Sequence, residues 1–220
     1  MSWLVPRWTS IPGLDHSFGD RHFPAPQPVT TLRQIHGQRV YDLQDLRGRE
    51  VEGDGLVTDR IPSRVGVWTA DCVPVHLLAP GARVAAVVHA GWRGSAAGVV
   101  ETAVDLLTTR WNLRPHEIEA AMGPAIGGCC YRVGDEVRAA FESRYGALGR
   151  TTFDERDGSL YLDLRKFLAA QLKSLGVSTV ERIGPCTACR TDLLCSYRKE
   201  GQTGRQLSFI GWRGEEPGSG

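Results

Sequence analysis

Residues 69–94 decide the fold, and they read TADCVPVHLLAPGARVAAVVHAGWRG. Two valine-rich runs meet in this region, 64–79 and 83–91, and both end in turn residues, which is the pattern of buried strands. The first run carries Asp71 and Cys72 in its middle, and the second delivers His89 onto a Gly-Trp-Arg-Gly turn. These three residues raise the question of what ionisable side chains do in buried strands.

The sequence on either side of this region alternates irregularly between strand and helix patterns. Apolar residues three and four positions apart predict helices over 95–111, 133–146 and 163–176. Without a regular βαβ rhythm, the pattern predicts an α+β protein with mixed β-sheets and flanking helices. Residues 44–54 are expected to form a loop, and residues 1–28, which five prolines interrupt, are expected to lie over the surface. Further strands are predicted at 55–59, 118–127, 178–184 and 206–212, and two short ones within 30–43 around Gly37.

The length and composition are those of an ordinary globular protein. With 220 residues, the chain is expected to form one domain over 1–220, with residues 213–220 a disordered tail. Its formal charge is +1, which implies no electrostatic attraction to nucleic acid or to an anionic membrane. No apolar run reaches the roughly 18 residues of a spanning helix, and the N-terminus has no signal-peptide pattern. The six cysteines are interpreted as reduced thiols, so we expect a cytoplasmic protein.

Three candidate metal ligands lie at or near predicted strand ends: His36, Cys72 and His89. Two imidazoles and one thiolate suit Zn²⁺, with copper also possible, and three protein ligands leave a coordination position open. Zinc with an open position lowers the pKa of bound water to about 7. The alternative is that Cys72 is a core thiol and both histidines are structural. His76 shares strand parity with Cys72 but lies roughly 13 Å away along an extended strand, so both residues cannot bind one ion.

Three arginines are candidates for binding phosphate: Arg93, Arg198 and Arg205. Arg93 follows a strand and precedes a predicted helix, so the helix N-terminus and the guanidinium together suit an anion. The alternative is that the two glycines beside it only make a sharp turn. Arg198 and Arg205 fall in the loop SYRKEGQTGRQ, which is either a solvated basic turn or a further phosphate contact.

The remaining cysteines give weaker signals. Cys129 and Cys130 lie in a glycine-rich loop before a predicted helix, and we expect them to pack, although metal or redox use is an alternative. Cys186 and Cys189 form a C-x-x-C pair, which is typical of half a zinc knuckle or a redox pair. No second C-x-x-C or spaced histidine pair follows, so the sequence gives structural zinc little support.

The order of the motifs resembles the laccase-domain family over about Gln34 to Gly211. The matching elements are QIHGQRV, GDGLVTD, TADCVPV, VVHAGWRG, GPAIGGCCYRVGDEV and SYRKEGQTGRQ. Members of this family are described as polyphenol oxidoreductases, purine nucleoside phosphorylases or peptidoglycan editing factors. The resemblance implies that His36, Cys72 and His89 bind a metal. It also implies phosphorolysis of adenosine, inosine and methylthioadenosine, adenosine deamination, and a fold shared with a cysteine-dependent bacterial toxin deamidase.

The chain departs from the family pattern at a few positions. Leu194 and Cys195 stand where the family usually has two aromatic residues, His76 where an aliphatic residue is usual, and Gly128 where proline is frequent. These positions belong to the pocket wall rather than to the ligand set, so they bear on substrate preference.

True laccase activity is not expected. A multicopper oxidase needs paired His-x-His elements, and none of the six histidines forms such a pair. An isolated copper site of the electron-transfer type needs an axial methionine, and only Met1 and Met122 are present to supply one.

The sequence therefore predicts a zinc-dependent purine nucleoside phosphorylase with adenosine deaminase activity. Asp71 is the candidate for proton transfer, and Arg93 positions phosphate. Its partners are a nucleoside and phosphate, with no nucleic acid or membrane, and the chain is expected to be a monomer or a homodimer. One alternative is a cysteine hydrolase or amidase that edits a peptidoglycan precursor, with Cys72 as nucleophile and His89 as base. A non-enzymatic metal- or redox-binding module is the third hypothesis.

Overall fold

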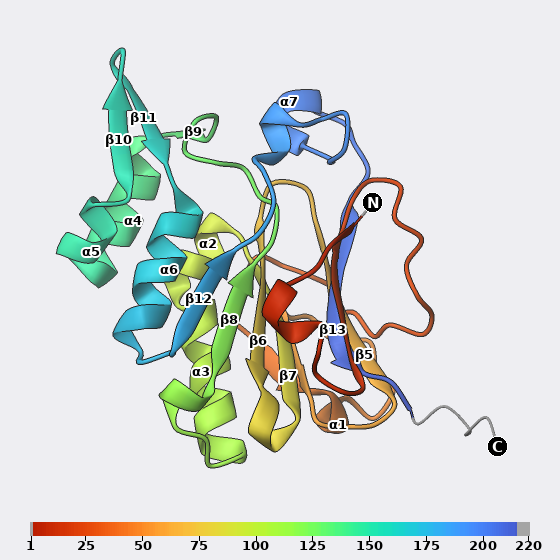
Figure 1. Ribbon diagram of the computed structural model, residues 1–220. Coiled ribbons are helices and arrows are strands. Elements are labelled where there is room, and N and C mark those ends of the chain that lie inside the picture. Colours follow the sequence, from red (N-terminus) through yellow and green to blue (C-terminus); the bar gives the residue numbers. More distant parts are fainter. Residues whose placement is uncertain (1, 215–220) are drawn as a thin grey trace.

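The computed structural model describes residues 2–214, in which helices, a six-stranded sheet and a four-stranded sheet form three successive layers (Figure 1). The predicted α+β class with mixed sheets is confirmed. In the described part of the chain, no helix is both long and apolar enough to span a bilayer.

The six-stranded sheet forms the middle layer. Its two outer pairs, β12–β8 and β4–β3, are parallel, and its inner pairs are antiparallel. The strands β6 and β7 are buried along their whole length, because another layer covers each face. In spatial order the strands are β12 (Thr179–Arg182), β8 (Glu119–Met122), β6 (Val73–Ala79), β7 (Val84–Ala90), β4 (Gly55–Thr58) and β3 (Val40–Asp42).

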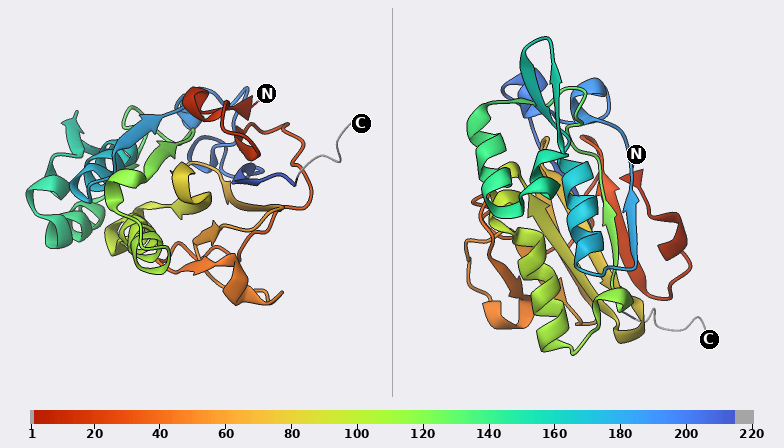
Figure 2. Two further views of the ribbon diagram at one scale, coloured as in Figure 1. Left: turned by 60° about the horizontal axis from the view of Figure 1, so that its bottom comes forward. Right: turned by 90° about the vertical axis from the view of Figure 1, so that its left-hand side faces the viewer.

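Helices cover one face of this sheet, as the right-hand view of Figure 2 shows. The alternation along β6 sends Val75 and Leu77 into the core beneath the helices, and Leu78 into the core on the opposite face. The predicted helices 133–146 and 163–176 are confirmed as α4 and α6. The helices are α1 (Leu43–Leu46), α2 (Trp92–Ala97), α3 (Val99–Arg110), α4 (Asp135–Tyr145), α5 (Ala147–Arg150), α6 (Leu164–Ser174) and α7 (Tyr197–Glu200).

The helix predicted over 95–111 starts earlier than expected and is divided in two. It begins at Trp92, directly after Gly91, so Arg93 lies in its first turn. Gly98 has a φ of 94° and separates α2 from α3. A residue in this left-handed conformation ends one helix, and the chain starts the next in a new direction.

The four-stranded sheet forms the third layer and corrects the prediction for residues 1–28. This segment was expected to lie over the surface, but it contributes a buried strand whose Phe18 packs between the two sheets. In spatial order the strands are β1 (Ser2–Trp3), β2 (Leu14–Gly19), β13 (Gln206–Trp212) and β5 (Ser63–Thr69).

The strand predicted over 64–79 is two strands in different sheets. The strand β5 belongs to the four-stranded sheet and β6 to the six-stranded one. The chain turns between them at Asp71, a non-glycine residue with a φ of 91°. Asp71 and Cys72 therefore lie in the connection between two sheets, not in the middle of one strand.

A small third sheet was not predicted. It contains β10 (Phe153–Arg156), β11 (Ser159–Leu162) and β9 (Arg132–Val133), and its β10–β11 hairpin projects at the upper left of Figure 1. The helix α1 also forms where a loop over 44–54 was expected to begin. Of the predicted tail, Arg213 donates its backbone N–H to the carbonyl of Gly13 (2.7 Å), and residues 215–220 lie outside the described part.

Candidate metal centre and adjoining cleft

Three predicted ligands meet at one edge of the six-stranded sheet. Cys72 immediately precedes β6, and His89 lies near the end of the antiparallel strand β7, opposite Pro74. His36 reaches them from the loop before β3. Their candidate ligand atoms all lie within 4.8 Å of one another. The structure therefore brings together the three residues that the sequence separates by 36 and 17 positions.

Asp54 holds two of these ligands in place. Its side chain is fully buried, and one carboxylate oxygen lies 2.8 Å from Nδ1 of His89. The same carboxylate accepts the backbone N–H groups of His36 (2.9 Å) and Gly37 (2.7 Å). Burial alone would raise the pKa of Asp54, but the bond to His89 and these amides hold it below its usual value. Because Asp54 occupies Nδ1, Nε2 of His89 is left as the ligand atom.

The backbone of Gly91 approaches two of the candidate ligands closely. A Cβ atom at Gly91 would lie 3.0 Å from Cδ2 of His36 and 3.1 Å from Sγ of Cys72. Any side chain at this position would therefore crowd two ligands at once. His36 itself has a φ of 59°, a conformation that costs energy in a non-glycine residue and that its hydrogen bond to Asp54 stabilises.

The electrostatics favour a thiolate on Cys72 and a proton on His89, and an arriving metal ion must displace that proton. Burial alone would raise the pKa of Cys72, but hydrogen bonds to His36 and His89 outweigh it and lower that pKa to about 6. Burial alone would lower the pKa of His89, but Asp54 and Cys72 raise it to about 9. Cys72 is thus a thiolate at neutral pH, the form that binds Zn²⁺ and copper. The two imidazoles and the thiolate fit such an ion.

Asp71 supports the loop that carries Cys72. One of its carboxylate oxygens accepts the hydroxyls of Thr187 (2.6 Å) and Ser196 (2.7 Å), and the other accepts the backbone N–H of Arg198 (2.7 Å). Its own carbonyl accepts the N–H of Ile126 (2.9 Å). With its carboxylate already used as an acceptor, the geometry favours a positioning role over the predicted proton transfer.

A cleft of about 530 Å³ opens beside the three ligands. All three predicted phosphate-binding arginines line it: Arg93, Arg198 and Arg205. The guanidinium of Arg93 lies 4.5 Å over the ring of Trp92, and within residues 2–214 neither Arg93 nor Arg205 has a hydrogen-bond or ion-pair partner. Arg198 differs, because it donates to the carbonyl of Arg132 and stacks over Tyr131. Two guanidinium groups in the cleft are therefore available to an anion.

Aromatic rings line the same cleft. Trp68 is 39% exposed and Tyr197 is 68% exposed, although large rings usually lie buried. The side-chain amide of Gln34 fixes the backbone of Trp68 by donating to its carbonyl and accepting its N–H, both at 2.8 Å. The loop before β3 thus provides a candidate metal ligand, His36, and also secures one wall of the cleft.

Several of these residues escaped the sequence interpretation. Asp54 was not singled out, although it stands between two glycines just before a strand in the GDG motif. A carboxylate between two glycines at the start of a strand was the signal that could have identified Asp54. Trp68 and Gln34 gave no signal, because a lone aromatic or amide residue is usually structural.

His76 lies away from the site, as the strand spacing predicted, so the expectation that it belongs to the pocket wall was wrong. The other departures from the family pattern, Leu194, Cys195 and Gly128, do not line the cleft either. His76 is fully buried, and its ring stacks on Phe18 with centroids 4.1 Å apart. Among the described residues neither ring nitrogen has a hydrogen-bond partner. Burial, followed by the charge of His16, holds the pKa of His76 well below its usual value.

The expectation that Cys129 and Cys130 pack was wrong for Cys129, whereas Cys130 is half-buried. Cys129 is exposed, and both residues lie beside Cys186 and Cys189 in a second group of possible ligands. The sixth cysteine, Cys195, is buried and separate from this group.

Comparison with known proteins gives consistent matches along the chain. The family described as multi-copper polyphenol oxidoreductase laccase matches residues 18–213. The purine nucleoside phosphorylase YlmD of Geobacillus stearothermophilus is 39% identical over 195 residues, which cover 83% of this chain and 71% of the relative. A purine nucleoside phosphorylase of Aquifex aeolicus is 32% identical over 190 residues, covering 86% and 85% of the two chains.

Solved structures agree with these sequence matches. The crystal structure of YlmD from Geobacillus stearothermophilus superposes with a TM-score of 0.86 at 29% identity and covers 97% of both chains. A Neisseria meningitidis protein superposes with a TM-score of 0.86 at 27% identity, covering 97% of this chain and 99% of its own. The three-layer arrangement is therefore shared over nearly the whole chain.

Proposed function

The chain belongs to the multi-copper polyphenol oxidoreductase laccase family, and on that premise we propose that it is a zinc-dependent purine nucleoside phosphorylase. Its substrates are adenosine, inosine and methylthioadenosine, and it also deaminates adenosine. Relatives named purine nucleoside phosphorylase match more than four-fifths of the chain, at 83% and 86%. One observation carries the proposal: a single cleft combines the His36–Cys72–His89 group, exposed aromatic rings and two arginines whose guanidinium groups have no ion-pair partner within residues 2–214.

His36, Cys72 and His89 would hold Zn²⁺, with copper the alternative ion. A bound ion supplies Lewis-acid polarisation of a substrate oxygen. Asp54 orients His89, because its bond to Nδ1 fixes the ring and leaves Nε2 as the atom that binds the ion.

Arg93 and Arg205 provide the charges that hold phosphate in the cleft. In phosphorolysis a phosphate oxygen bonds to the anomeric carbon of ribose while the bond from that carbon to the purine nitrogen breaks. Two guanidinium groups facing one cleft hold the phosphate dianion near the sugar. The phosphate then no longer has to meet the bound nucleoside by diffusion, which lowers the entropic part of the barrier. Arg198 lines the same cleft but is already engaged with Tyr131 and Arg132.

Trp68 and Tyr197 offer ring faces to the purine. An aromatic side chain stacked on a nucleobase contributes roughly 1–3 kcal/mol and tolerates different bases. Such a contact suits an enzyme that accepts adenine and hypoxanthine nucleosides alike. In deamination the oxygen of water bonds to C6 of the adenine while the bond from C6 to the amino nitrogen breaks, and the protons of water pass to the leaving ammonia and to the purine ring. The nucleoside occupies the same cleft in both reactions.

A specific arrangement favours a second candidate, the cysteine hydrolase or amidase acting on a peptidoglycan precursor. Cys72, His89 and Asp54 are arranged like a catalytic triad, with Cys72 as the nucleophile, His89 as the base and Asp54 as the carboxylate that orients His89. The pKa of Cys72 is already lowered to about 6. A non-enzymatic metal- or redox-binding module is the third candidate, and it predicts no turnover at all.

A nucleoside panel tests the proposal directly. Each nucleoside is incubated with the protein in the presence and absence of phosphate, and the products are identified by mass spectrometry. Free purine and a ribose 1-phosphate that appear only with phosphate support phosphorolysis, and inosine formed from adenosine supports deamination. If no nucleoside reacts, the phosphorylase proposal is wrong.

Alkylation of Cys72 separates a ligand from a nucleophile. A thiolate bound to Zn²⁺ reacts slowly, so iodoacetamide should leave Cys72 unmodified in native protein and label it readily after chelation. Added Zn²⁺ should restore protection and activity together. Cys72→His should keep partial activity, because imidazole replaces thiolate as a ligand but not as an acyl-forming nucleophile. Rapid labelling of Cys72 in active, metal-replete protein would instead favour the hydrolase.

The cytoplasmic location and the monomeric or homodimeric state stay predictions. Gel filtration with light scattering measures the oligomeric state.

A further inference from the structure

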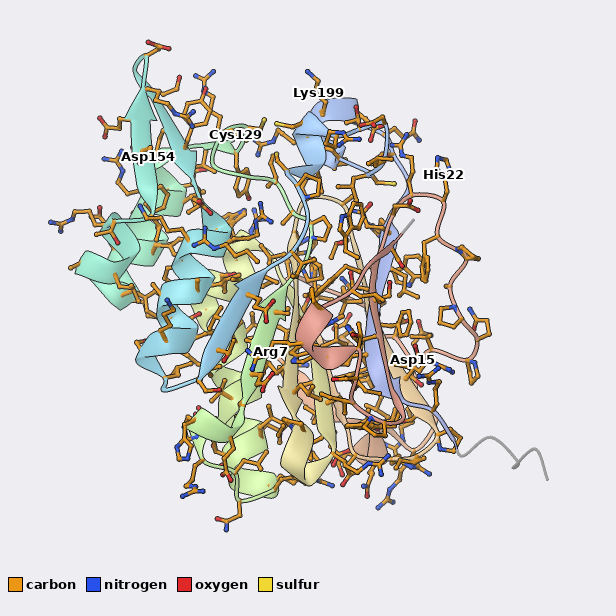
Figure 3. All side chains as sticks on the ribbon, viewed as in Figure 1. Arg7, Asp15, His22, Cys129, Asp154 and Lys199 are labelled. Atoms are coloured by element: carbon orange, nitrogen blue, oxygen red, sulfur yellow. The ribbon has the colours of Figure 1, made fainter. Side chains whose placement is uncertain are left out.

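Four cysteines from two loops meet outside the cleft. Cys129 and Cys130 follow β8, and Cys186 and Cys189 follow β12. Because β8 and β12 are parallel neighbours, both loops leave the same edge of the sheet. Figure 3 shows Cys129 at this upper edge, between the hairpin that carries Asp154 and the segment that carries Lys199.

We propose that Cys129, Cys130, Cys186 and Cys189 bind a second Zn²⁺ as a closed, structural four-thiolate site. The proposal stands apart from the proposed function, because none of these residues lines the cleft.

The sulfur geometry supports a single ion. All four Sγ atoms lie within 4.8 Å of one another, with Cys129 and Cys130 at 3.7 and 3.4 Å from Cys189. A tetrahedral zinc site with bonds of about 2.3 Å places its sulfurs about 3.8 Å apart. An iron–sulfur cluster distributes its four cysteines over two or four irons and so holds some of them farther apart. Four protein ligands leave no open position, which is typical of structural rather than catalytic zinc.

The surroundings suit a negatively charged site. The backbone N–H of Gly127 donates to Sγ of Cys186 at 3.1 Å, the type of bond that stabilises a zinc thiolate. Arg165 lies close enough for the charges of Cys186 and Cys129 to act on it, and Arg156 donates to the carbonyl of Gly128 in the same loop. These cations offset the net charge of –2 that Zn²⁺ and four thiolates carry together.

The position of the site explains what the ion would do. The loops already touch through a parallel bridge between Ala125 and Cys186 and a bond from the N–H of Thr187 to the carbonyl of Ala125 (3.1 Å). Thr187 in turn donates to Asp71, and Tyr131, which follows Cys130, lines the cleft. A zinc ion would fasten both loops behind the cleft wall without touching substrate.

Zinc content in a set of variants tests the proposal. Full-length protein is purified without chelator, and zinc per chain is measured by elemental analysis. We expect about two Zn²⁺ in the wild type and about one in Cys72→Ala, which keeps only the four-thiolate site. Cys186→Ser/Cys189→Ser in the Cys72→Ala background should bind none. Cys195→Ser is the matched control, because Cys195 is a buried cysteine of the same segment outside the group, and it should bind as the wild type does.

Cobalt(II) identifies the ligands even if the double variant fails to fold. Added to metal-free Cys72→Ala, it should bind one equivalent and give the intense thiolate-to-cobalt absorption of a tetrahedral four-sulfur site. A Cys72→Ala protein that folds but binds neither zinc nor cobalt would overturn the proposal. So would a disulfide between the two loops in protein purified under reducing conditions, seen as a 2 Da mass loss.

Discussion

Two buried histidines on neighbouring strands behave in opposite ways. His89, near the end of β7, is 3% exposed and bonded to Asp54, and its pKa is raised to about 9. His76, in the middle of β6, is fully buried against Phe18, and its pKa is lowered. Burial opposes the charged form in both places, so the partners of His89, Asp54 and Cys72, make the difference. Both partners lie at the sheet edge, where the start of β4 is beside the end of β7.

The two histidines therefore give opposite dependence of stability on pH. For metal-free protein, the stabilisation from the raised pKa of His89 is complete below its unfolded value of about 6.5 and is lost as pH rises through about 9. For His76, whose folded pKa is lowered, the stability is present above about 6.5 and is lost as the pH falls below it.

Removing the charge of Asp54 should reduce the difference between the two histidines and have the largest effect. Asp54→Asn weakens the orientation of His89 and the hold on the His36 loop, so we expect metal affinity and phosphorolysis to fall about 100-fold. Competition with a chromogenic chelator measures the affinity. Asp59→Asn is the matched control, because Asp59 lies just beyond the other end of β4 and accepts from Gln44 and Trp111. Equal affinity in the two variants would contradict the role given to Asp54.

Arg93→Ala tests whether the positive charge at this edge of the sheet binds phosphate. We expect phosphorolysis at low phosphate to fall about 30-fold, since hydrogen bonds to charged groups contribute roughly 2 kcal/mol, while deamination stays unchanged. Arg83→Ala is the control at the opposite end of β7, where the guanidinium stacks 5.0 Å over Trp212, and it should affect neither reaction. An equal loss of both activities in Arg93→Ala would make Arg93 structural.

Trp68→Ala should separate binding from folding. We expect the KM for nucleoside to rise about 10-fold, from the loss of one stacked ring, with little change in stability. The interior counterpart is Phe18→Leu, which removes the ring stacked on His76 and should lower stability by about 1–2 kcal/mol without changing the KM. Kinetics and thermal unfolding of both variants are the measurements, and a stability loss confined to Trp68→Ala would refute the distinction.

His76→Leu should have the smallest effect and sharpen the contrast. The variant loses the group that gains a proton on unfolding, so its stability should fall less than that of the wild type between pH 7 and pH 5. We expect a gain of about 1 kcal/mol at pH 5 and a smaller one at pH 8, where both states hold neutral histidine. Urea unfolding at the two pH values measures this gain in stability. An equal gain at both pH values would show that protonation of His76 does not cause it.

The sequence was sufficient to predict the helices and strands that have a strong hydrophobic periodicity. The amphipathic patterns gave α4 and α6, and the valine-rich runs gave β6 and β7. The ligand types in matching motifs pointed to His36, Cys72 and His89, which the structure places together.

Features set by long-range neighbours could not be read in the same way. The change of sheet at Asp71 depends on a left-handed non-glycine residue inside a continuous apolar run. The cysteine group depends on β8 and β12 being parallel neighbours, although 60 positions separate Cys129 from Cys189. The strand β2 was hidden because prolines on both sides of it suggested an irregular segment.

Two residues at the site have left-handed conformations, the candidate ligand His36 and Asp71 next to Cys72, and they bear on when the proposed zinc ion would bind. His36 and Asp71 each hold a conformation that costs roughly 1–3 kcal/mol, and the hydrogen bonds that compensate for it come from the protein itself. The cost is thus met during folding, before any ion is present. Small zinc domains behave differently, because they fold only as the ion binds. We therefore expect this chain to fold in zinc-poor conditions and to take up the ion of the His36–Cys72–His89 site afterwards, in one kinetic step without refolding.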